Sequence, residues 1–506
     1  MAQQEIGKIG NDSTKSEVQT IVKRLAEVVL TLQVQREMRH KMASGISSSE
    51  SDQLPLFPAT SLAKLARFLS TFPPPADPSL VSAQDFLTLL HVLHPKLAYA
   101  SKPAKRALEE TLKSAGFGSW AEGLAELDSV EALLAEGIFG WELKGIQRED
   151  PSKARVIFAR RGCENVSVLV GAGPLELLPW PLRSTPDLAV TPRFTHLLAS
   201  LIQLHSLNWD VSFVPSSASL QSASSSTSLV ITNFASLLGY DLEVCHLYKE
   251  LGGRELFMRR VVGNGGETGW QESALVKGMK EGKLVWLESV DTIGATFGSL
   301  ARLVSDREGE LWEGKRLVIQ DGSSSSPILD SIHPSFRLIT SSSKSVPVTQ
   351  WLTEELTSNL LSLPTTPMNL AEERSLLVAT GCPTHLVDLM ETFAIQYRAI
   401  TSNVGSKARK LGTKSLLRMA KRLARFPHED LRTMLERALL VQFLPITEKD
   451  QIEDLMVQVG LQVAPLRVRA VLSKLGTQAR LTFSVPPRSI RRSKLQGSPS
   501  FSDRGS

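Results

Sequence analysis

One feature constrains this fold more than any other. It is a short helix followed directly by an apolar strand that ends in a carboxylate. Residues 273–281 have apolar side chains at helical spacing, and residues 284–287 (LVWL) form a run suited to a buried strand. Glu288 follows at the C-terminal end of that strand. In an open parallel α/β sheet, this edge is where ligands bind. An acid there suits nucleotide hydrolysis, because Mg²⁺ takes hard oxygen ligands.

The sequence on either side alternates between apolar strands and helical patterns. We expect a helix over Thr191–Leu207, a strand over Val211–Val214, a helix from Leu229 and a strand over Phe336–Ile339. This alternation predicts an α/β fold whose parallel sheet contains Leu284–Leu287 together with the other two strands.

Five longer segments carry a resemblance to a known family. They are LGYDLE (238–243), RELFMRR (254–260), SALVKGMKEGKLVWLESV (273–290), GSLARLVSDREGELWEGKRL (298–317) and IHPSFRLI (332–339). Together they resemble the dynein-related, MoxR-like branch of the AAA+ ATPases, over most of residues 15–445. More narrowly, they resemble the second AAA+ module of a mitochondrial member of that branch. The resemblance implies a P-loop NTPase-like core with helical lid domains before and after it, and ATP and Mg²⁺ as cofactors.

The segment where the phosphate loop belongs has lost the residues of such a loop. It reads PSSASLQSASSSTS, from Pro215 to Ser228, and contains neither glycine nor lysine. A phosphate loop needs glycines, so that backbone N–H groups can approach phosphate, and a lysine followed by Ser or Thr. Counted back from the helix, Thr227 takes the lysine position and Ser228 the position of the Mg²⁺-binding hydroxyl. A mobile, phosphate-free Ser-rich linker is the favoured interpretation.

The acids at the strand tip are altered as well. The family pattern is Asp followed by Glu, whereas this chain has Glu288 followed by Ser289 at the catalytic position. Glu288 retains an oxygen ligand for Mg²⁺, although a surface cap or salt bridge is the favoured alternative. Ser289 cannot act as a general base near neutral pH without an activating partner.

The resemblance places three further functional positions. The arginine finger falls near Asn359, which cannot supply charge to a transition state. The second-sensor arginine falls on Lys414, which keeps the charge but loses the bidentate fork. The first-sensor polar residue lies within Thr340–Ser343. With most of these sites altered, we expect little or no ATP turnover.

The chain is long enough for several domains. We expect a disordered N-terminus over 1–14, a helical domain over 15–130 that resembles the lid of a preceding AAA+ module, and a linker with a small β-element over 131–188. The AAA+ core follows over 189–345, then a helical lid over 346–445 and a C-terminal segment over 446–506 with a basic disordered tail. Within these, helices are expected over 15–40, 54–73 and 83–99, and the β-element over 163–180.

Composition is that of a globular protein, with 42% hydrophobic and 22% charged residues, and without an apolar stretch of transmembrane length. The three cysteines, Cys163, Cys245 and Cys382, form no metal or redox pattern, so we expect a reducing compartment and burial.

The resemblance implies mitochondria. The N-terminus contains acids and lacks the arginines of a presequence, so the cytoplasm is the alternative. A chain that starts inside a larger ancestral protein and has lost its leader would explain this N-terminus, and a truncated gene would look the same.

The net charge of +5 is concentrated in two basic segments. One contains Lys407, Arg409, Lys410, Lys414, Arg418, Lys421, Arg422 and Arg425, and the other contains Arg488, Arg491, Arg492 and Lys494. The first has an apolar face and no interleaved aromatic residues, which favours a solvated helix face over a nucleic-acid site. His91 and His94 have a spacing that could suit a metal, but their apolar helical context favours a structural role.

These features favour a degenerate module that acts as a scaffold or assembly subunit, with protein partners that include homologous AAA+ modules in a ring. The alternative is an active ATP-binding and ATP-hydrolysing remodelling protein. A serine hydrolase based on the Ser-rich run is a third and weaker hypothesis, because no base stands at an informative spacing.

Overall fold

The computed structural model separates the chain into two compact units, Met1–Glu429 and Asp430–Ser506, which are described one at a time. The residues that the structure describes are 12–42, 60–75, 81, 83–123, 136–182, 189–215, 224–262, 266–311, 315–319, 329–342, 351–353, 357, 359–365, 368–401 and 411–461. The expectations for the N-terminus before residue 12, the loop 216–223 and the tail beyond 461 fall outside these ranges.

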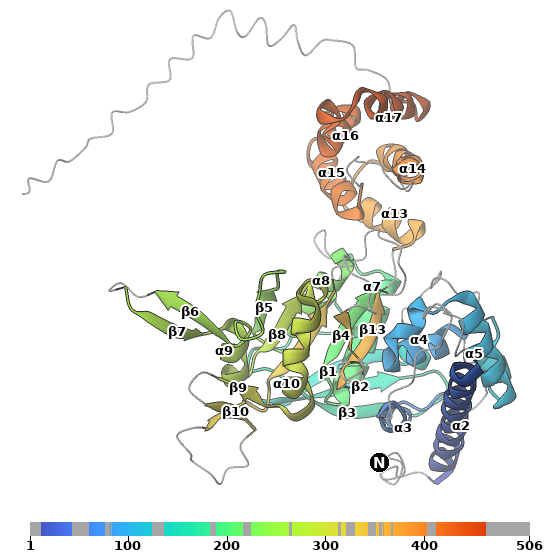
Figure 1. Ribbon diagram of the computed structural model, residues 1–506. Helices are drawn as coiled ribbons and strands as arrows, with labels where there is room; N and C mark the ends of the chain where they lie inside the picture. Colours follow the sequence, from blue (N-terminus) through green and yellow to red (C-terminus); the bar gives the residue numbers. More distant parts are fainter. Residues whose placement is uncertain are drawn as a thin grey trace, which may run out of the picture. The chain divides into compact units, whose positions relative to one another are not determined.

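A five-stranded parallel sheet forms the centre of the first unit (Figure 1). Its order is β13–β4–β12–β8–β5, built from Leu361–Thr365, Val211–Pro215, Arg337–Ser341, Leu284–Glu288 and Leu242–His246. The three strands predicted from the sequence are the central three, so the predicted fold class is confirmed. The sheet ends at β13, beyond the expected core boundary at residue 345.

Helices cover both faces of this sheet, and the alternation of side chains along β8 shows how. Leu284 and Trp286 share one hydrophobic cluster with α7 (Pro192–Ser206) and α8 (Ser224–Leu237). Val285 and Leu287 point to the opposite face. There they meet α9 (Ala274–Glu281), the 3₁₀ segment η5 (Val290–Leu300) and α10 (Ala301–Asp306).

Local signals explain the ends of these helices. Thr191 caps α7 by accepting a hydrogen bond from the N–H of Phe194, and Ser273 caps α9 by accepting one from Val276. Gly282 ends α9 in the left-handed conformation at φ 74°, where an added Cβ would lie 2.3 Å from the His333 ring. Helix α8 begins at Ser224, five residues before the expected start at Leu229, so it includes the end of the Ser-rich run.

A three-stranded antiparallel sheet precedes α7. It consists of β1 (Glu142–Asp150), β2 (Lys153–Ala159) and β3 (Val166–Gly171). The expected β-element at 163–180 contains only β3, and the two longer strands lie before it. Ala154, Val156 and Phe158 alternate along β2 into the same hydrophobic cluster as α7.

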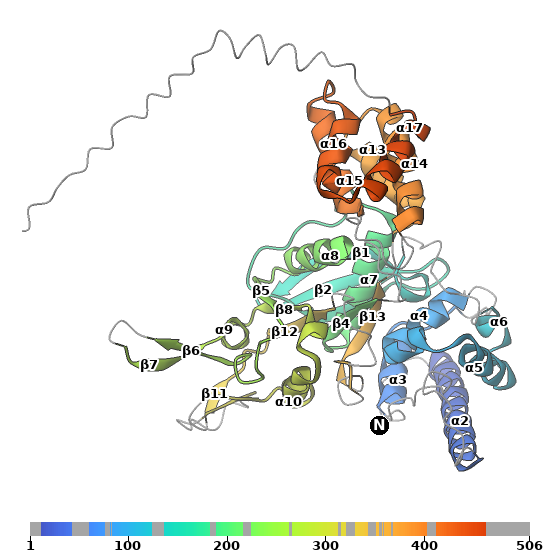
Figure 2. The ribbon, with the colours of Figure 1, turned by 45° about the horizontal axis from the view of Figure 1, so that its top comes forward.

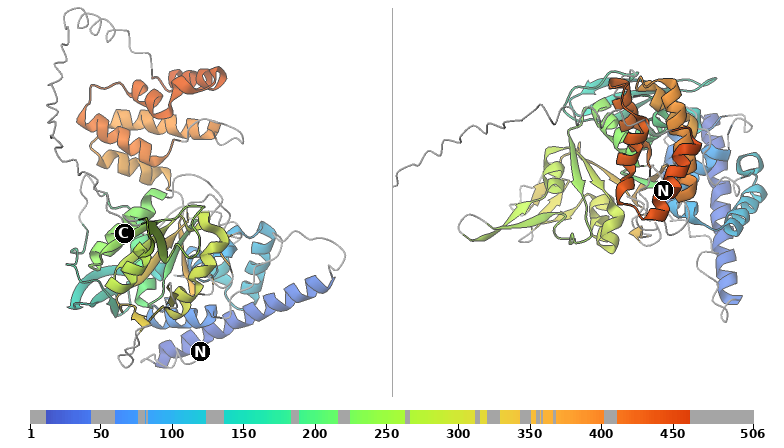
Figure 3. Two further views of the ribbon diagram at one scale, coloured as in Figure 1. Left: turned by 60° about the vertical axis from the view of Figure 1, so that its left-hand side comes forward. Right: turned by 90° about the horizontal axis from the view of Figure 1, so that it is seen from above.

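The N-terminal part is helical, as expected. Figure 3 shows α2 (Asp12–Met42) as one continuous helix, and it contacts α3 (Ser61–Thr71) and α5 (Lys102–Ser114). The helix expected over 83–99 is interrupted, because Pro95 ends α4 (Ala83–Leu93) and starts the 3₁₀ helix η3 (Pro95–Tyr99). Two short elements complete this part, α6 (Gly118–Ala121) and η4 (Ile138–Gly140).

Two small β-structures extend from the core (Figure 2). The hairpin of β6 (Met258–Val262) and β7 (Thr268–Glu272) projects away from the five-stranded sheet. The second is a three-stranded sheet of order β11–β10–β9, built from Leu329–Ser331, Arg316–Val318 and Gly309–Glu310.

The expected lid over 346–445 is divided between the two units. Helices α13 (Leu370–Ala379), α14 (Thr384–Thr401) and α15 (Thr413–Arg425) belong to the first unit. The second unit contains α16 (Leu431–Leu439), η7 (Val441–Phe443) and α17 (Ile446–Gln458), and its first helix is capped by Asp430. Over the described part of the chain, no helix has the length and apolar character needed to cross a membrane.

Candidate functional site

The carboxyl ends of the parallel strands bring Glu288 beside His246. The two residues are register partners on β8 and β5, and Glu288 Oε2 lies 2.5 Å from His246 Nδ1. Both side chains are solvent-accessible, with exposed fractions of 38% for Glu288 and 77% for His246. The strand-tip acid therefore has a surface partner, which sequence reasoning could not identify because it lies on another strand.

Ser289 turns the chain immediately after the strand. Its backbone is left-handed, with φ 65° and ψ 44°. Its carbonyl accepts hydrogen bonds from the backbone N–H of Thr292 at 3.0 Å and from the Thr292 hydroxyl at 2.7 Å. The residue thus shapes the turn into η5, and it offers a neutral hydroxyl where the family pattern has a carboxylate.

The hydroxyls at the end of β12, where the first sensor is expected, make contacts within the sheet. Thr340 is fully buried, and its hydroxyl donates to Ser212 Oγ at 2.8 Å. Ser341 Oγ accepts a hydrogen bond from Trp286 Nε1, also at 2.8 Å. Both residues therefore stabilise the packing between neighbouring strands.

The start of α8 carries the two positions assigned to the phosphate loop. Because the helix begins at Ser224, both Thr227 and Ser228 lie in its first turns. Thr227 is buried, and the Ser228 carbonyl accepts a hydrogen bond from Thr232 Oγ1 at 3.0 Å. A helix N-terminus favours anions through its free N–H groups, but it does not replace the missing lysine.

A cavity of about 230 Å³ lies between α7 and α8 on one side and α13 and α15 on the other. Leu229, which directly follows Ser228, lines it together with Phe194 and Leu417. Its cationic residues all come from α15 and are Lys414, Arg418 and Lys421. Lys414, at the second-sensor position, thus lines the same cavity as α8, the helix that includes the end of the Ser-rich run. The opposite face of α15 buries Leu416, Met419, Ala420 and Leu423, so this basic helix is amphipathic as expected.

A buried ion pair connects the two sides of this cavity. Arg193 Nε, in the first turn of α7, lies 3.0 Å from Glu372 Oε2 in the first turn of α13. The Arg193 side chain is 1% exposed and that of Glu372 is 9% exposed. Glu372 also completes a capping box with Asn369. The N-x-x-E spacing at 369–372 is a sequence signal for the helix start, but it does not reveal a partner 179 residues away.

The remaining predicted positions are dispersed. Asn359 is half-buried and lies just before β13. His91 and His94 are buried in the helical N-terminal part, and burial, with Lys105 and His94 nearby, lowers the pKa of His91 to about 3. In the described ranges, no group of three or more His, Cys, Asp or Glu side chains could hold a metal ion. The expected burial applies to Cys382 and in part to Cys245, whereas Cys163 is exposed.

Comparisons with known proteins agree with this geometry. Residues 227–360 match the family model described as the AAA domain of the dynein-related subfamily. The chain is also similar to von Willebrand factor A domain-containing protein 8 of Mus musculus, with 27% identity over 434 residues. That match covers 81% of this chain and 21% of the mouse protein, so the chain spans about a fifth of the length of this relative. The sheet and the family match together confirm the predicted resemblance to the dynein-related AAA+ ATPases, and the α/β core has the fold of the AAA+ P-loop NTPases.

Proposed function

We propose that this chain is a degenerate AAA+ module that acts as a scaffold or assembly subunit, with little or no ATP turnover. The observation that carries the proposal is where the family match begins. It starts at Thr227, so the run of serines in which the phosphate-binding glycines would stand lies outside the match, and threonine occupies the lysine position. Without that lysine, nothing in the run offsets the charge of a triphosphate.

The strand tip supports the same conclusion. Hydrolysis needs a metal ligand and a group that positions or activates water. The available acid, Glu288, is paired with His246, and the next residue is Ser289. The residues present, which include Ser228 as the other proposed metal ligand, do not fit a hydrolysing Mg²⁺–ATP centre. We therefore assign no catalytic step to them.

The cavity beside α15 favours a second candidate, in which the module retains affinity for nucleotide. Lys414 and Arg418 provide positive charge there, and Phe194 and Leu229 provide apolar surface for a base. An active ATP-binding and ATP-hydrolysing remodelling protein is the stronger form of this alternative. It requires the Ser-rich run to hold phosphate through hydroxyl and backbone groups alone.

The expected partners are proteins, in particular homologous AAA+ modules in a ring. We further propose that the chain corresponds to the second AAA+ module of the mouse relative, and that it is mitochondrial, with the cytoplasm as the alternative. The apolar face of α15 packs internally, and its cationic face lines the cavity, so we do not propose nucleic acid as a partner.

Calorimetric titration of the purified chain with ATP and with ADP, both in the presence of Mg²⁺, tests the proposal alongside a phosphate-release assay. We expect no phosphate release above the rate of a protein-free blank. Heat of binding that disappears in Lys414→Gln, without phosphate release, would support nucleotide retention by the cavity. Phosphate release that disappears in Glu288→Gln would overturn the proposal in favour of the active enzyme.

A further inference from the structure

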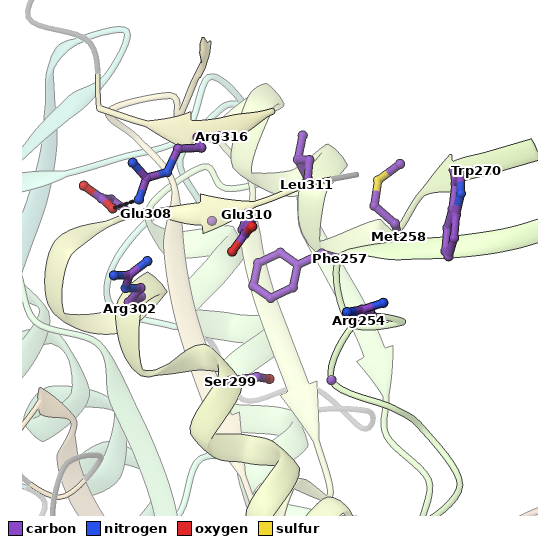
Figure 4. A pocket seen from close by; sticks show the side chains of 12 residues that line it. Arg254, Phe257, Met258, Trp270, Ser299, Arg302, Glu308, Glu310, Leu311 and Arg316 are labelled. Carbon is purple, nitrogen blue, oxygen red and sulfur yellow. Dashed lines mark hydrogen bonds and ion pairs between the residues drawn. The ribbon is translucent and has the colours of Figure 1, made fainter. Parts of the chain in front are cut away.

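A cavity lies at the base of the β6–β7 hairpin, away from the strand tips and from α15. It has a volume of about 620 Å³, which is within the range typical of ligand sites. Figure 4 shows that its walls come from the start of β6, from β7, from the η5–α10 segment and from the small β9–β10 sheet. We call it the hairpin cavity.

The polar lining of the hairpin cavity has an excess of positive charge, with three arginines and two glutamates. Arg316 is paired with Glu308 at 3.5 Å, which leaves Arg254, Arg302 and Glu310. All three of these side chains are exposed. Within the described ranges, neither the Arg254 nor the Arg302 guanidinium makes a hydrogen bond or an ion pair, so both can receive an anionic group.

The apolar lining is on the hairpin side. Phe257, Met258 and Trp270 line the cavity there, and Figure 4 shows Arg254 on the same side of the cavity as Trp270 and Met258. Trp and Arg are the residue types that most often anchor a protein partner. The cavity therefore offers an apolar surface for a large side chain beside a cationic group for a carboxylate.

A strand at the edge of a sheet lies at the same place. Strand β9 (Gly309–Glu310) is at the edge of its sheet, where β10 is its only neighbour among the described strands. Gly309, Glu310 and Leu311 all line the cavity. An extended peptide can add to such an edge through main-chain hydrogen bonds, while pockets beside it select the side chains.

We propose that the hairpin cavity binds an extended segment of a partner protein in which an aspartate or glutamate is next to a large apolar residue. The acid pairs with Arg254, the apolar side chain packs on Trp270 and Phe257, and Arg302 on the opposite wall adds positive charge (Figure 4). The excess of arginine over glutamate selects an acidic segment over a basic one. Glu310 repels any second acid placed on its side, which favours a segment with few carboxylates.

The test uses the full chain, without nucleotide, and two pools of short acetylated and amidated peptides. One pool has Asp or Glu fixed beside a varied apolar position, and the other has Asn or Gln in place of the acid. We expect fluorescence anisotropy to detect binding from the acidic pool only. Arg254→Gln should weaken it about tenfold, which corresponds to about 1.4 kcal/mol. Arg302→Gln should weaken it less, because Arg302 lies on the opposite wall. Arg161→Gln, a change of the same type on the exposed β2–β3 turn, is the matched control.

Trp270→Ala should weaken the same peptides and leave the preference for the acidic pool unchanged. The proposal is overturned if no acidic peptide binds, if both pools bind equally, or if the double variant of Arg254 and Arg302 keeps the wild-type affinity. Both arginines are exposed, so loss of fold is not the expected cause of lost binding. Because the assay contains no nucleotide, its outcome is independent of whether the module turns over ATP.

Discussion

Arg307 donates two hydrogen bonds to the carboxylate of Asp210, at 2.5 and 2.9 Å, and this pair fixes one end of the core sheet. Asp210 immediately precedes β4 and its side chain is 1% exposed. The same carboxylate accepts the backbone N–H of Leu338, and the Asp210 carbonyl accepts that of Leu361. One residue therefore connects the ends of β4, β12, β13 and α10. Arg307 also lies over the Phe336 ring, 5.5 Å from its centroid.

Arg307→Met should lower the free energy of unfolding of the core by about 3–5 kcal/mol, because it leaves Asp210 buried without its charge partner. Arg307→Lys should lower the free energy of unfolding by less, since lysine keeps the charge but cannot form the bidentate hydrogen bonds. Urea unfolding followed by circular dichroism measures both. The matched control is Arg316→Gln, whose ion pair with Glu308 is exposed and should be worth less than about 1 kcal/mol. Equal losses for Arg307→Met and Arg316→Gln would contradict the structural role of the buried pair.

His205 should make the stability of the core depend on pH in the acidic range. Burial lowers the pKa of His205 to about 4, with Arg337 adding to the effect and the Gly171 carbonyl opposing it. Because the folded pKa is below the unfolded value, the unfolded state binds more protons, and stability falls as the pH decreases from about 6.5 to about 4. The contribution of His205 to the free energy of unfolding falls by about 3 kcal/mol over that window.

His205→Gln keeps a donor for the Gly171 carbonyl and removes the ionisable group. We expect it to reduce the slope of the stability curve between about pH 6.5 and pH 4, measured by urea unfolding at several pH values, and the buried His91 keeps part of that slope. His385→Gln, a change of the same type at an exposed position of α14, should leave the slope as in the wild type. An unchanged slope in His205→Gln would assign the pH dependence to other buried groups.

The elements that sequence reasoning found are those specified by local signals. Helix α9 and strand β8 have a serine cap at Ser273, a left-handed Gly282 and an unbroken apolar run, all within 16 residues from Ser273 to Glu288. Strand β13 was not predicted from the sequence because Pro364 lies inside it. Proline is tolerated there because β13 is at the edge of the sheet, and sheet position is not a local property.

The candidate site, too, could be predicted from the sequence only in part. The loss of the phosphate-loop residues and of the second acid after Glu288 can be read directly from the sequence. The partners of the remaining groups cannot. His246 reaches Glu288 through strand register, and Arg193 reaches Glu372 through the packing of α7 on α13. The hairpin cavity likewise combines residues from five separate segments of the sequence, and none of these segments indicates a binding site by itself.

The Arg193–Glu372 pair should hold α13 against the core. Burial lowers the pKa of Arg193 and Glu372 opposes that shift, so Glu372→Gln leaves a buried charge without its counterion. We expect a local destabilisation of about 3–5 kcal/mol, visible as faster amide hydrogen exchange over α13. Asp388→Asn, which removes an exposed partner of Arg374 in the neighbouring α14, should leave that exchange unchanged. Unchanged protection of α13 in Glu372→Gln would show that the pair does not hold the helix.

Single repairs should not restore ATP turnover. Ser289→Glu supplies the missing carboxylate, but it leaves a phosphate loop without glycine or lysine and Asn359 at the finger position. Thr227→Lys supplies a cation at a buried position in the first turns of α8, where it would be held without the glycine backbone that approaches phosphate. Phosphate binding, water activation and charge stabilisation act as one unit, so repairing one part gains little. We expect phosphate release from the wild type, Ser289→Glu and Thr227→Lys to equal the rate of the protein-free blank. Turnover by the wild type that Glu288→Gln abolishes would instead show that the His246-paired carboxylate is catalytic.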